Sequence, residues 1–225
     1  MTPAVAGAAT PAGAGVVDVP ASYPVQEVVE HFSGPVISVR TDVVRMPDGD
    51  LARRDYAIHP GAVGVIALDE QERILLLQQY RHPPRRLLWE PPAGILDVVG
   101  EPALQAAKRE LHEEAAYVAA EWWLLADLLT SPGMSDEALR IFLARGLTPV
   151  PIADRYVGVH EEADMPVQWV ALEDAVTAAL GGALHNPTAV VGILALYAVR
   201  QRGWGDLRAP DTPWPERPTG GGSSA

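Results

Sequence analysis

Hydrophobic and polar residues alternate loosely through the first part of the chain and predict a series of strands. β-Branched residues recur through residues 23–34 and 35–49, and the turn-forming sequence Pro-Asp-Gly closes the second segment. Two apolar segments, residues 62–70 and 73–81, are joined by a short polar turn and predict two further strands. The segment at residues 87–94 contains adjacent prolines, which disfavour helix and predict an extended chain.

Later segments have the spacing of helices. Residues 101–116 place apolar side chains on one face, and Pro102 suits the first turn of that helix. Residues 168–182 contain the end of a strand followed by a helix. Residues 186–203 predict a C-terminal helix, in which Asn186 is the expected N-cap.

Two strand-like segments, residues 122–132 and 138–147, separate the first of these helices from the second. The order of strands, helix, strands and two helices is typical of an α/β layered domain with a mixed sheet and helices on both sides. The ends of the chain are rich in Ala, Gly, Pro and Ser and have little to bury. We therefore expect four regions. They are a disordered N-terminal tail at 1–21, an N-terminal β segment at 22–58, the main folded domain at 59–208 and a flexible C-terminal tail at 209–225.

The charge and composition of the 225 residues limit the possible partners. The formal net charge is −12, which argues against nucleic acid or an anionic membrane as a partner, because phosphate groups attract positive charge. The absence of cysteine excludes disulfides, thiolate metal ligands and cysteine nucleophiles. The N-terminus lacks the pattern of a signal peptide, and the longest apolar run, residues 189–199, is too short to span a bilayer. We therefore expect a cytoplasmic protein.

Three glutamates, Glu110, Glu113 and Glu114, crowd into five residues of the first predicted helix. At 100° per residue they border the apolar stripe instead of pointing to open water; the stripe comprises Leu104, Ala107, Leu111, Ala115 and Val118. One interpretation is a solvated helix face with ion pairs such as that between Arg109 and Glu113. The other is a site for Mg²⁺ or Mn²⁺, because grouped carboxylates repel one another unless a cation offsets their charge, and such sites serve phosphate-bearing substrates.

The segment at residues 94–117 resembles the Nudix box of the Nudix hydrolases. The box consists of a glycine, five residues, a glutamate, seven residues and then Arg-Glu-aliphatic-x-Glu-Glu-x-Gly-aliphatic. This chain has Gly94, six residues, Glu101, seven residues and then Arg-Glu-Leu-His-Glu-Glu-Ala-Ala-Tyr. It departs from the box in the longer first gap, in Ala116 at the late glycine and in Tyr117 at the last aliphatic position, and none of these changes removes an acid. The resemblance implies the Nudix fold, an α/β/α sandwich with a mixed sheet, here with an added N-terminal β segment.

The resemblance also implies a role for each residue of the box. More than one Mg²⁺ or Mn²⁺ ion would be held by the carbonyl of Ala93 and the carboxylates of Glu110, Glu113 and Glu114. Arg109 would orient these acids and, with Glu113, take part in catalysis. Glu101 would support the helix end, and Gly94 would let the loop backbone approach the metal.

The flanking segments resemble the ADP-ribose pyrophosphatase branch of the family over residues 24–207. They include residues 78–82, 87–101, 130–144, 160–175 and 186–196. This likeness implies hydrolysis of ADP-ribose to AMP and ribose 5-phosphate. It also implies that a loop after the box, residues 158–165, supplies the general base: Glu161, or else Glu162. The alternative interpretation of this loop is an acidic surface without a role.

Substrate-binding residues are expected outside the box. Arg81 can bind phosphate oxygens with two parallel hydrogen bonds, although it could also be a surface arginine at a strand end. Arg54 and Glu90 match positions near the substrate in this branch, whereas the isolated His59 is interpreted as an ordinary histidine. The branch further implies a domain-swapped homodimer in which residues 23–44 complete the adenine pocket of the partner.

Three rival functions remain open from the sequence. The first is hydrolysis of another nucleoside diphosphate sugar such as GDP-mannose, which would need only a different base pocket. The second is a non-catalytic module that binds ADP-ribose; the retained box acids and the lack of a basic helix-turn-helix segment after Val170 argue against it. The third is a nucleoside triphosphatase, against which the long region before Gly61 argues.

Overall fold

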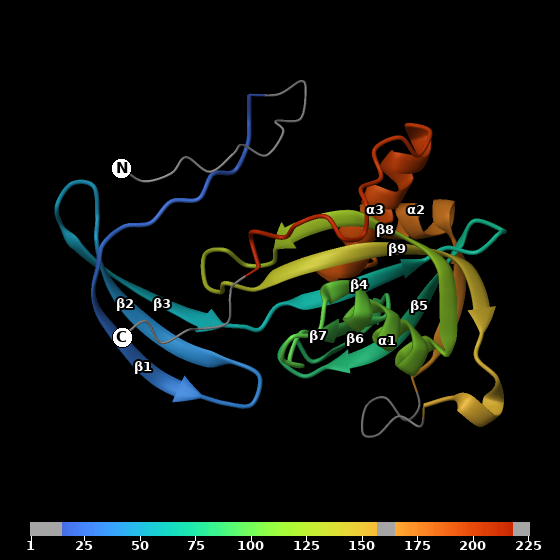
Figure 1. The fold of residues 1–225 in the computed structure, drawn as a ribbon, viewed down its shortest axis with the longest axis horizontal. Coiled ribbons are helices and arrows are strands. Elements are labelled where there is room, and N and C mark those ends of the chain that lie inside the picture. Colours follow the sequence, from blue (N-terminus) through green and yellow to red (C-terminus); the bar gives the residue numbers. More distant parts are fainter. Residues whose placement is uncertain (1–14, 157–164, 218–225) are drawn as a thin grey trace.

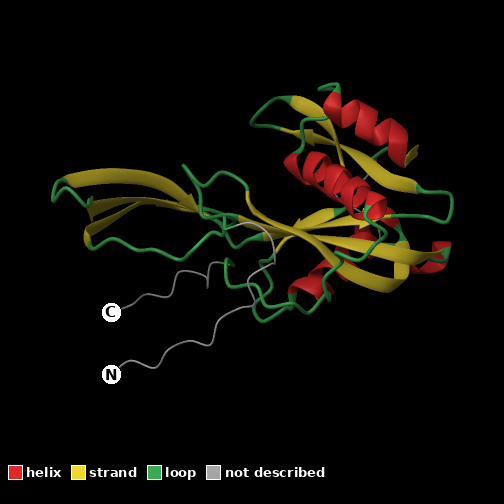
Figure 2. Ribbon diagram, turned by 90° about the horizontal axis from the view of Figure 1, so that it is seen from above, coloured by secondary structure: helices red, strands yellow, loops and turns green. Residues whose placement is uncertain are grey.

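A computed structural model describes residues 15–156 and 165–217 of the chain. The protein consists of a layered α/β body from which a small N-terminal sheet projects (Figure 1). Figure 2 shows the same sheet extending away from the part that the helices cover. In the described ranges no helix is both long and apolar enough to cross a membrane.

The N-terminal sheet is antiparallel in the order β1-β2-β3. Its strands are β1 (Val25–Ser33), β2 (Ser38–Arg45) and β3 (Leu51–Ile58). Apolar side chains remain exposed along it, including Val28 at 56% and Phe32 at 54%. The N-terminal β segment is thus confirmed, and it leaves apolar surface uncovered within the single chain.

The body contains a four-stranded and a three-stranded sheet. The first has the order β7-β4-β9-β8 and is mixed, because β4 runs parallel to β9 while the other pairs are antiparallel. The second has the antiparallel order β10-β5-β6. The strands are β4 (Ala62–Ala67), β5 (Arg73–Arg81), β6 (Arg86–Glu90), β7 (Ala93–Ile95), β8 (Tyr117–Leu129), β9 (Ala138–Pro149) and β10 (Val167–Ala171).

Helices cover both faces of the four-stranded sheet, and the predicted sandwich is confirmed. They are α1 (Ala103–Ala115), α2 (Leu172–Leu180) and α3 (Pro187–Gln201), with a 3-10 turn at Ile152–Asp154. Neighbouring residues of β9 point to opposite faces, so Phe142 joins the core under α1 while Ile141 joins the core under α2 and α3. The tryptophans of β8 divide in the same way: Trp122 is buried on the α1 side, and Trp123 packs partly buried on the other.

The first helix ends earlier than its apolar stripe suggested. Ala116 adopts a left-handed conformation with φ of 56° and donates its N–H to the carbonyl of His112. This residue therefore acts as the C-cap that glycine usually supplies. Val118 belongs to β8 and is 47% exposed, so its predicted place in the buried stripe of the helix was wrong.

The third helix begins as predicted. The side chain of Asn186 accepts a hydrogen bond of 2.9 Å from the amide of Ala189, and Pro187 occupies the first helical position. Gly64 on β4 lies so close to this helix that an added Cβ would be 2.3 Å from Cγ2 of Thr188. This contact places the start of α3 against β4, next to the strand β7 where the candidate site lies.

A buried arginine holds part of the C-terminal segment against the body. Arg140 on β9 is 3% exposed; it pairs with Asp127 at 2.7 Å and donates to the carbonyls of Thr212 and Pro213 at 2.7 and 3.3 Å. The ring of Trp214 lies over its guanidinium, 4.6 Å from centroid to Cζ. These contacts engage residues up to 214 of the predicted flexible tail, while residues 218–225 lie outside the described part.

We predict that Trp214→Ala destabilises the protein, because it removes the ring that covers Arg140. The loss should be about 2 kcal/mol, or about 5 °C in melting temperature. Trp214→Phe is the matched control: the indole Nε1 is buried without a hydrogen-bond partner among the described residues, so only the ring matters. Thermal unfolding followed by circular dichroism measures both. Equal melting temperatures of Trp214→Ala and wild type would show that the ring of Trp214 does not hold the C-terminal segment against the body.

Candidate active site

The glutamates of α1 lie against the first residues of β7. Glu114 Oε2 accepts a hydrogen bond of 2.9 Å from the amide of Ala93. Glu110 is only 9% exposed, and a Cβ added at Gly94 would lie 2.0 Å from its Oε1. Because only glycine leaves room for this contact, Gly94 allows the strand backbone and the carboxylates to share one small space.

Arg109 donates hydrogen bonds to three glutamates of the box. Its guanidinium donates to Glu101 at 3.1 and 3.2 Å, to Glu110 at 2.7 Å and to Glu113 at 3.3 Å. The hydrogen bonds to Glu101 are the largest cause that raises the pKa of Arg109; partial burial opposes them, and the charges of Glu110 and Glu113 add to them. Arg109 is therefore a cation at any working pH and offsets the repulsion among the acids.

Two cavities meet at β7. The smaller, of about 250 Å³, is walled by Arg109 and the glutamates Glu110, Glu113 and Glu114. The larger, of about 470 Å³, extends from β7 toward the start of α3. The residues that line both are Arg81, Ala93, Gly94 and Ile95. A ligand that extends through both cavities would therefore lie against Arg81 and β7.

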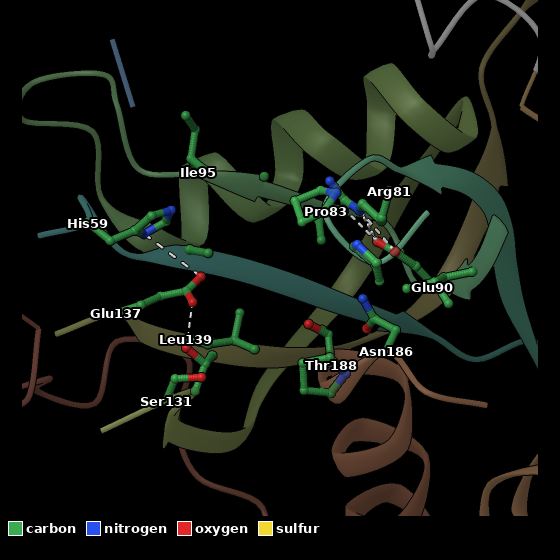
Figure 3. A pocket seen from close by; sticks show the side chains of 17 residues that line it. His59, Arg81, Pro83, Glu90, Ile95, Ser131, Glu137, Leu139, Asn186 and Thr188 are labelled. Carbon is green, nitrogen blue, oxygen red and sulfur yellow. Dashed lines mark hydrogen bonds and ion pairs between the residues drawn. The ribbon is translucent and has the colours of Figure 1, made fainter. Parts of the chain in front are cut away.

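Arg81 stands at the boundary and is held there by Glu90. Glu90 is 2% exposed and accepts from Nη2 of Arg81 at 2.6 Å and from Nε at 3.0 and 3.1 Å. Figure 3 shows the two side chains pointing toward one another at one end of the larger cavity. The structure thus brings two of the expected substrate-binding residues together beside the box acids.

The other end of the larger cavity is polar, and the sequence patterns did not predict that its residues belong to the site. There His59 Nδ1 lies 3.8 Å from Oε1 of Glu137, and the hydroxyl of Thr130 donates to the same carboxylate. Ser131 lies beside them (Figure 3). The signal in the sequence was the cluster of turn-forming and polar residues between the two strand patterns of β8 and β9, which marks a loop able to carry functional groups.

The remaining expected site residues are not brought together with these. Arg54 lines a third cavity of about 490 Å³, which also includes Met134 and Asp136. Its guanidinium donates to the carbonyl of Arg53 at 3.0 Å. Glu161 and Glu162, the expected general bases, lie outside the described residues, so their role stays a prediction.

The carboxylate cavity has the chemistry of a divalent-cation site. Its side chains offer hard oxygen donors, which Mg²⁺ and Mn²⁺ prefer, and Gly94 leaves the backbone close to them. Among the described residues no three acidic or histidine side chains lie close enough together to hold a metal ion as they stand. Arg109 and the amide of Ala93 instead engage these carboxylates. Metal binding by the carbonyl of Ala93 stays a prediction. The contact that the structure shows is the hydrogen bond from the amide of Ala93 to Glu114.

Comparison with known proteins agrees with this geometry. The family model described as NUDIX domain matches residues 58–189. The chain is 43% identical over 187 residues, covering 83% of this chain and 88% of the relative, to a protein of Mycobacterium tuberculosis (strain ATCC 25618 / H37Rv) named ADP-ribose pyrophosphatase. It is 37% identical over 144 residues, 64% of this chain and 76% of the relative, to a protein of the same name from Bacillus subtilis (strain 168).

A solved structure titled "Crystal structure of ADP compounds hydrolase" has the same fold. It superposes with a TM-score of 0.63 at 20% identity, covering 84% of this chain and 99% of that chain. The extent of the family match, the relatives and the complete set of box acids lead to one conclusion: the chain belongs to the Nudix hydrolase family.

Proposed function

We propose that this protein hydrolyses the diphosphate of ADP-ribose to AMP and ribose 5-phosphate with the help of Mg²⁺ or Mn²⁺. The observation that carries the proposal is the junction of the two cavities at Arg81 and β7. A diphosphate lying there would contact both the carboxylate cavity and Arg81, and its sugar would enter the larger cavity. The names of the two relatives support ADP-ribose as the substrate.

The residues of the carboxylate cavity would share the catalytic work. Glu110, Glu113 and Glu114, with the carbonyl of Ala93, would hold more than one metal ion, as the family likeness implies. Bound divalent ions supply charge neutralisation for the diphosphate and lower the pKa of the attacking water. Arg109 would keep the glutamates oriented, since its guanidinium already bridges Glu110 and Glu113.

The remaining steps fall to Arg81 and the loop base. The guanidinium of Arg81 would bind diphosphate oxygens and hold the P–O–P linkage in place. Glu161, or else Glu162, would accept a proton from the water as its oxygen attacks one phosphorus. The bond from that phosphorus to the bridging oxygen then breaks, and the bridging oxygen leaves with the other phosphate.

The polar end of the larger cavity suits a ribose. Glu137 and the hydroxyls of Thr130 and Ser131 are groups that can exchange hydrogen bonds with sugar hydroxyls. His59 lies on the same wall, within 3.8 Å of Glu137. These side chains support a sugar in this cavity.

The N-terminal sheet, which projects from the body, supports the expected homodimer. The exposed apolar side chains of the N-terminal sheet, among them Val28 and Phe32, offer a surface that a second copy could cover. In this arrangement residues 23–44 would complete the adenine pocket of the partner. We further propose that this homodimer is cytoplasmic.

The first prediction tests the substrate. Purified protein is incubated with ADP-ribose, GDP-mannose and a diadenosine polyphosphate, each with Mg²⁺ and with EDTA, and the products are separated by ion-exchange chromatography. AMP should appear fastest from ADP-ribose and only with metal. Faster turnover of GDP-mannose would favour the other nucleotide-sugar hydrolases. Binding of ADP-ribose without turnover of any substrate would favour the non-catalytic module.

The second prediction concerns the contact at β7. Gly94→Ala places a methyl group where Glu110 now lies, so the carboxylate must move by an ångström or more. We expect kcat to fall about 100-fold, because such a displacement near the reacting atoms has effects of that size. Gly205→Ala is the control, since a Cβ there meets nothing within 4 Å and its backbone is not in the left-handed region. A Gly94→Ala enzyme with wild-type kcat would contradict the site.

The third prediction separates the two candidate bases. Glu161→Gln should lower kcat about 100-fold, since it removes the proton acceptor, while the Mn²⁺ affinity measured by titration stays unchanged. Glu162→Gln should have little effect on either quantity. If only Glu162→Gln lowers kcat, the base is Glu162, and if neither does, this loop does not supply the base.

A further inference from the structure

Glu90 is an acidic side chain in a place where an anionic substrate would not favour one. It ends β6 and lines the larger cavity, yet it is 2% exposed. A carboxylate that touched a diphosphate directly would repel it, and burying a carboxylate costs free energy unless a partner compensates. The compensating partner is Arg81, which makes three hydrogen bonds with both carboxylate oxygens.

The strand register shows what this pair does to Arg81. Arg81 lies directly opposite Arg86, whereas Glu90 lies opposite Leu77, four residues before Arg81 in β5. Four residues of a strand span about 13 Å, so the side chain of Arg81 folds back along the sheet face to reach Glu90. Without Glu90 this side chain would be free to extend past the strand end, where water hydrates the guanidinium.

The direction of the arginine decides whether it reaches the site. Folded back, the guanidinium borders both the carboxylate cavity and the larger cavity. Its side chain remains 43% exposed, whereas that of Glu90 is 2% exposed, so the arginine is the accessible member of the pair. Oxygens of a ligand at the junction would meet Arg81 before they could meet Glu90.

We propose that Glu90 is a positioning residue, which turns Arg81 inward to the junction of the two cavities and makes no contact with the substrate itself. This inference deepens the proposed function and rests on it for the identity of the anion. It assigns Glu90 a role different from the substrate-binding role that the family likeness implied.

A double-mutant cycle tests the proposal. Glu90→Gln, Arg81→Ala and the double variant are compared with wild type for KM and kcat with ADP-ribose. Glu90→Gln alone should raise KM about tenfold, a typical coupling between residues in contact, with a smaller change in kcat. In the Arg81→Ala background the same substitution should change KM by less than about twofold. Equal effects of Glu90→Gln in both backgrounds would show direct contact with the substrate and overturn the proposal.

Two controls separate positioning from loss of stability. Asp127→Asn breaks another arginine–carboxylate pair, that with Arg140 at 2.7 Å, and should lower the melting temperature without raising KM. Glu90→Asp retains the charge, and should leave KM closer to wild type than Glu90→Gln does. If Glu90→Gln does not fold, the cycle is measured with Glu90→Asp, whose effect must likewise vanish in the Arg81→Ala background.

The test remains decisive if the substrate proves to be different. In that case the wild-type protein does not hydrolyse ADP-ribose, and the proposed function fails by itself. The same cycle is then measured as affinity for inorganic pyrophosphate by isothermal titration calorimetry. Weaker binding in Glu90→Gln that disappears in the Arg81→Ala background supports the positioning role. Additive losses, or unchanged affinity in Glu90→Gln, reject it.

Discussion

Repulsion among closely spaced carboxylates is the constraint on which the rest of this structure depends. Glu110, Glu113 and Glu114 lie on one helix beside the buried face, where water screens their charges poorly. Arg109 offsets part of the repulsion and the amide of Ala93 another part. The close approach of β7 to α1, possible because Gly94 has no side chain, makes the acids face a strand backbone instead of water. This arrangement supports the proposed site for divalent cations.

The two sheets of the body place further polar side chains around the glutamates of α1, and together they form a cavity for a substrate. The end of β5 carries Arg81 to the cavity that α1 and β7 form, and Glu90 on the neighbouring strand directs its guanidinium. The loop between β8 and β9 brings Glu137 and Ser131 to the opposite wall. The glutamates of α1, the guanidinium of Arg81 and the polar side chains near Glu137 thus line two adjoining cavities. This arrangement suits a charged diphosphate with an attached sugar.

The residues near one another in the sequence were predictable, and those joined only by the fold were not. The box acids share one helix, so their spacing alone placed them on one side. The cap at Asn186 was found from another local signal, an N-cap residue type directly before an apolar helical segment. Glu137 is 78 residues from His59 in the sequence, and contacts such as the parallel pairing of β4 with β9 and the hydrogen bond from the amide of His59 to Asp136 bring them together. The contact of Arg140 with the C-terminal segment is equally long-range. Helix periodicity failed at Val118, because it does not mark where a left-handed residue ends the helix.

The most direct test of the account is a crystal structure of the protein with Mn²⁺ and a non-hydrolysable analogue of ADP-ribose, with the metal located by anomalous scattering. The account predicts manganese peaks among the carboxylates of Glu110, Glu113 and Glu114, next to Ala93, with the diphosphate against Arg81. Manganese bound away from these glutamates, or a diphosphate that does not reach Arg81, would contradict it.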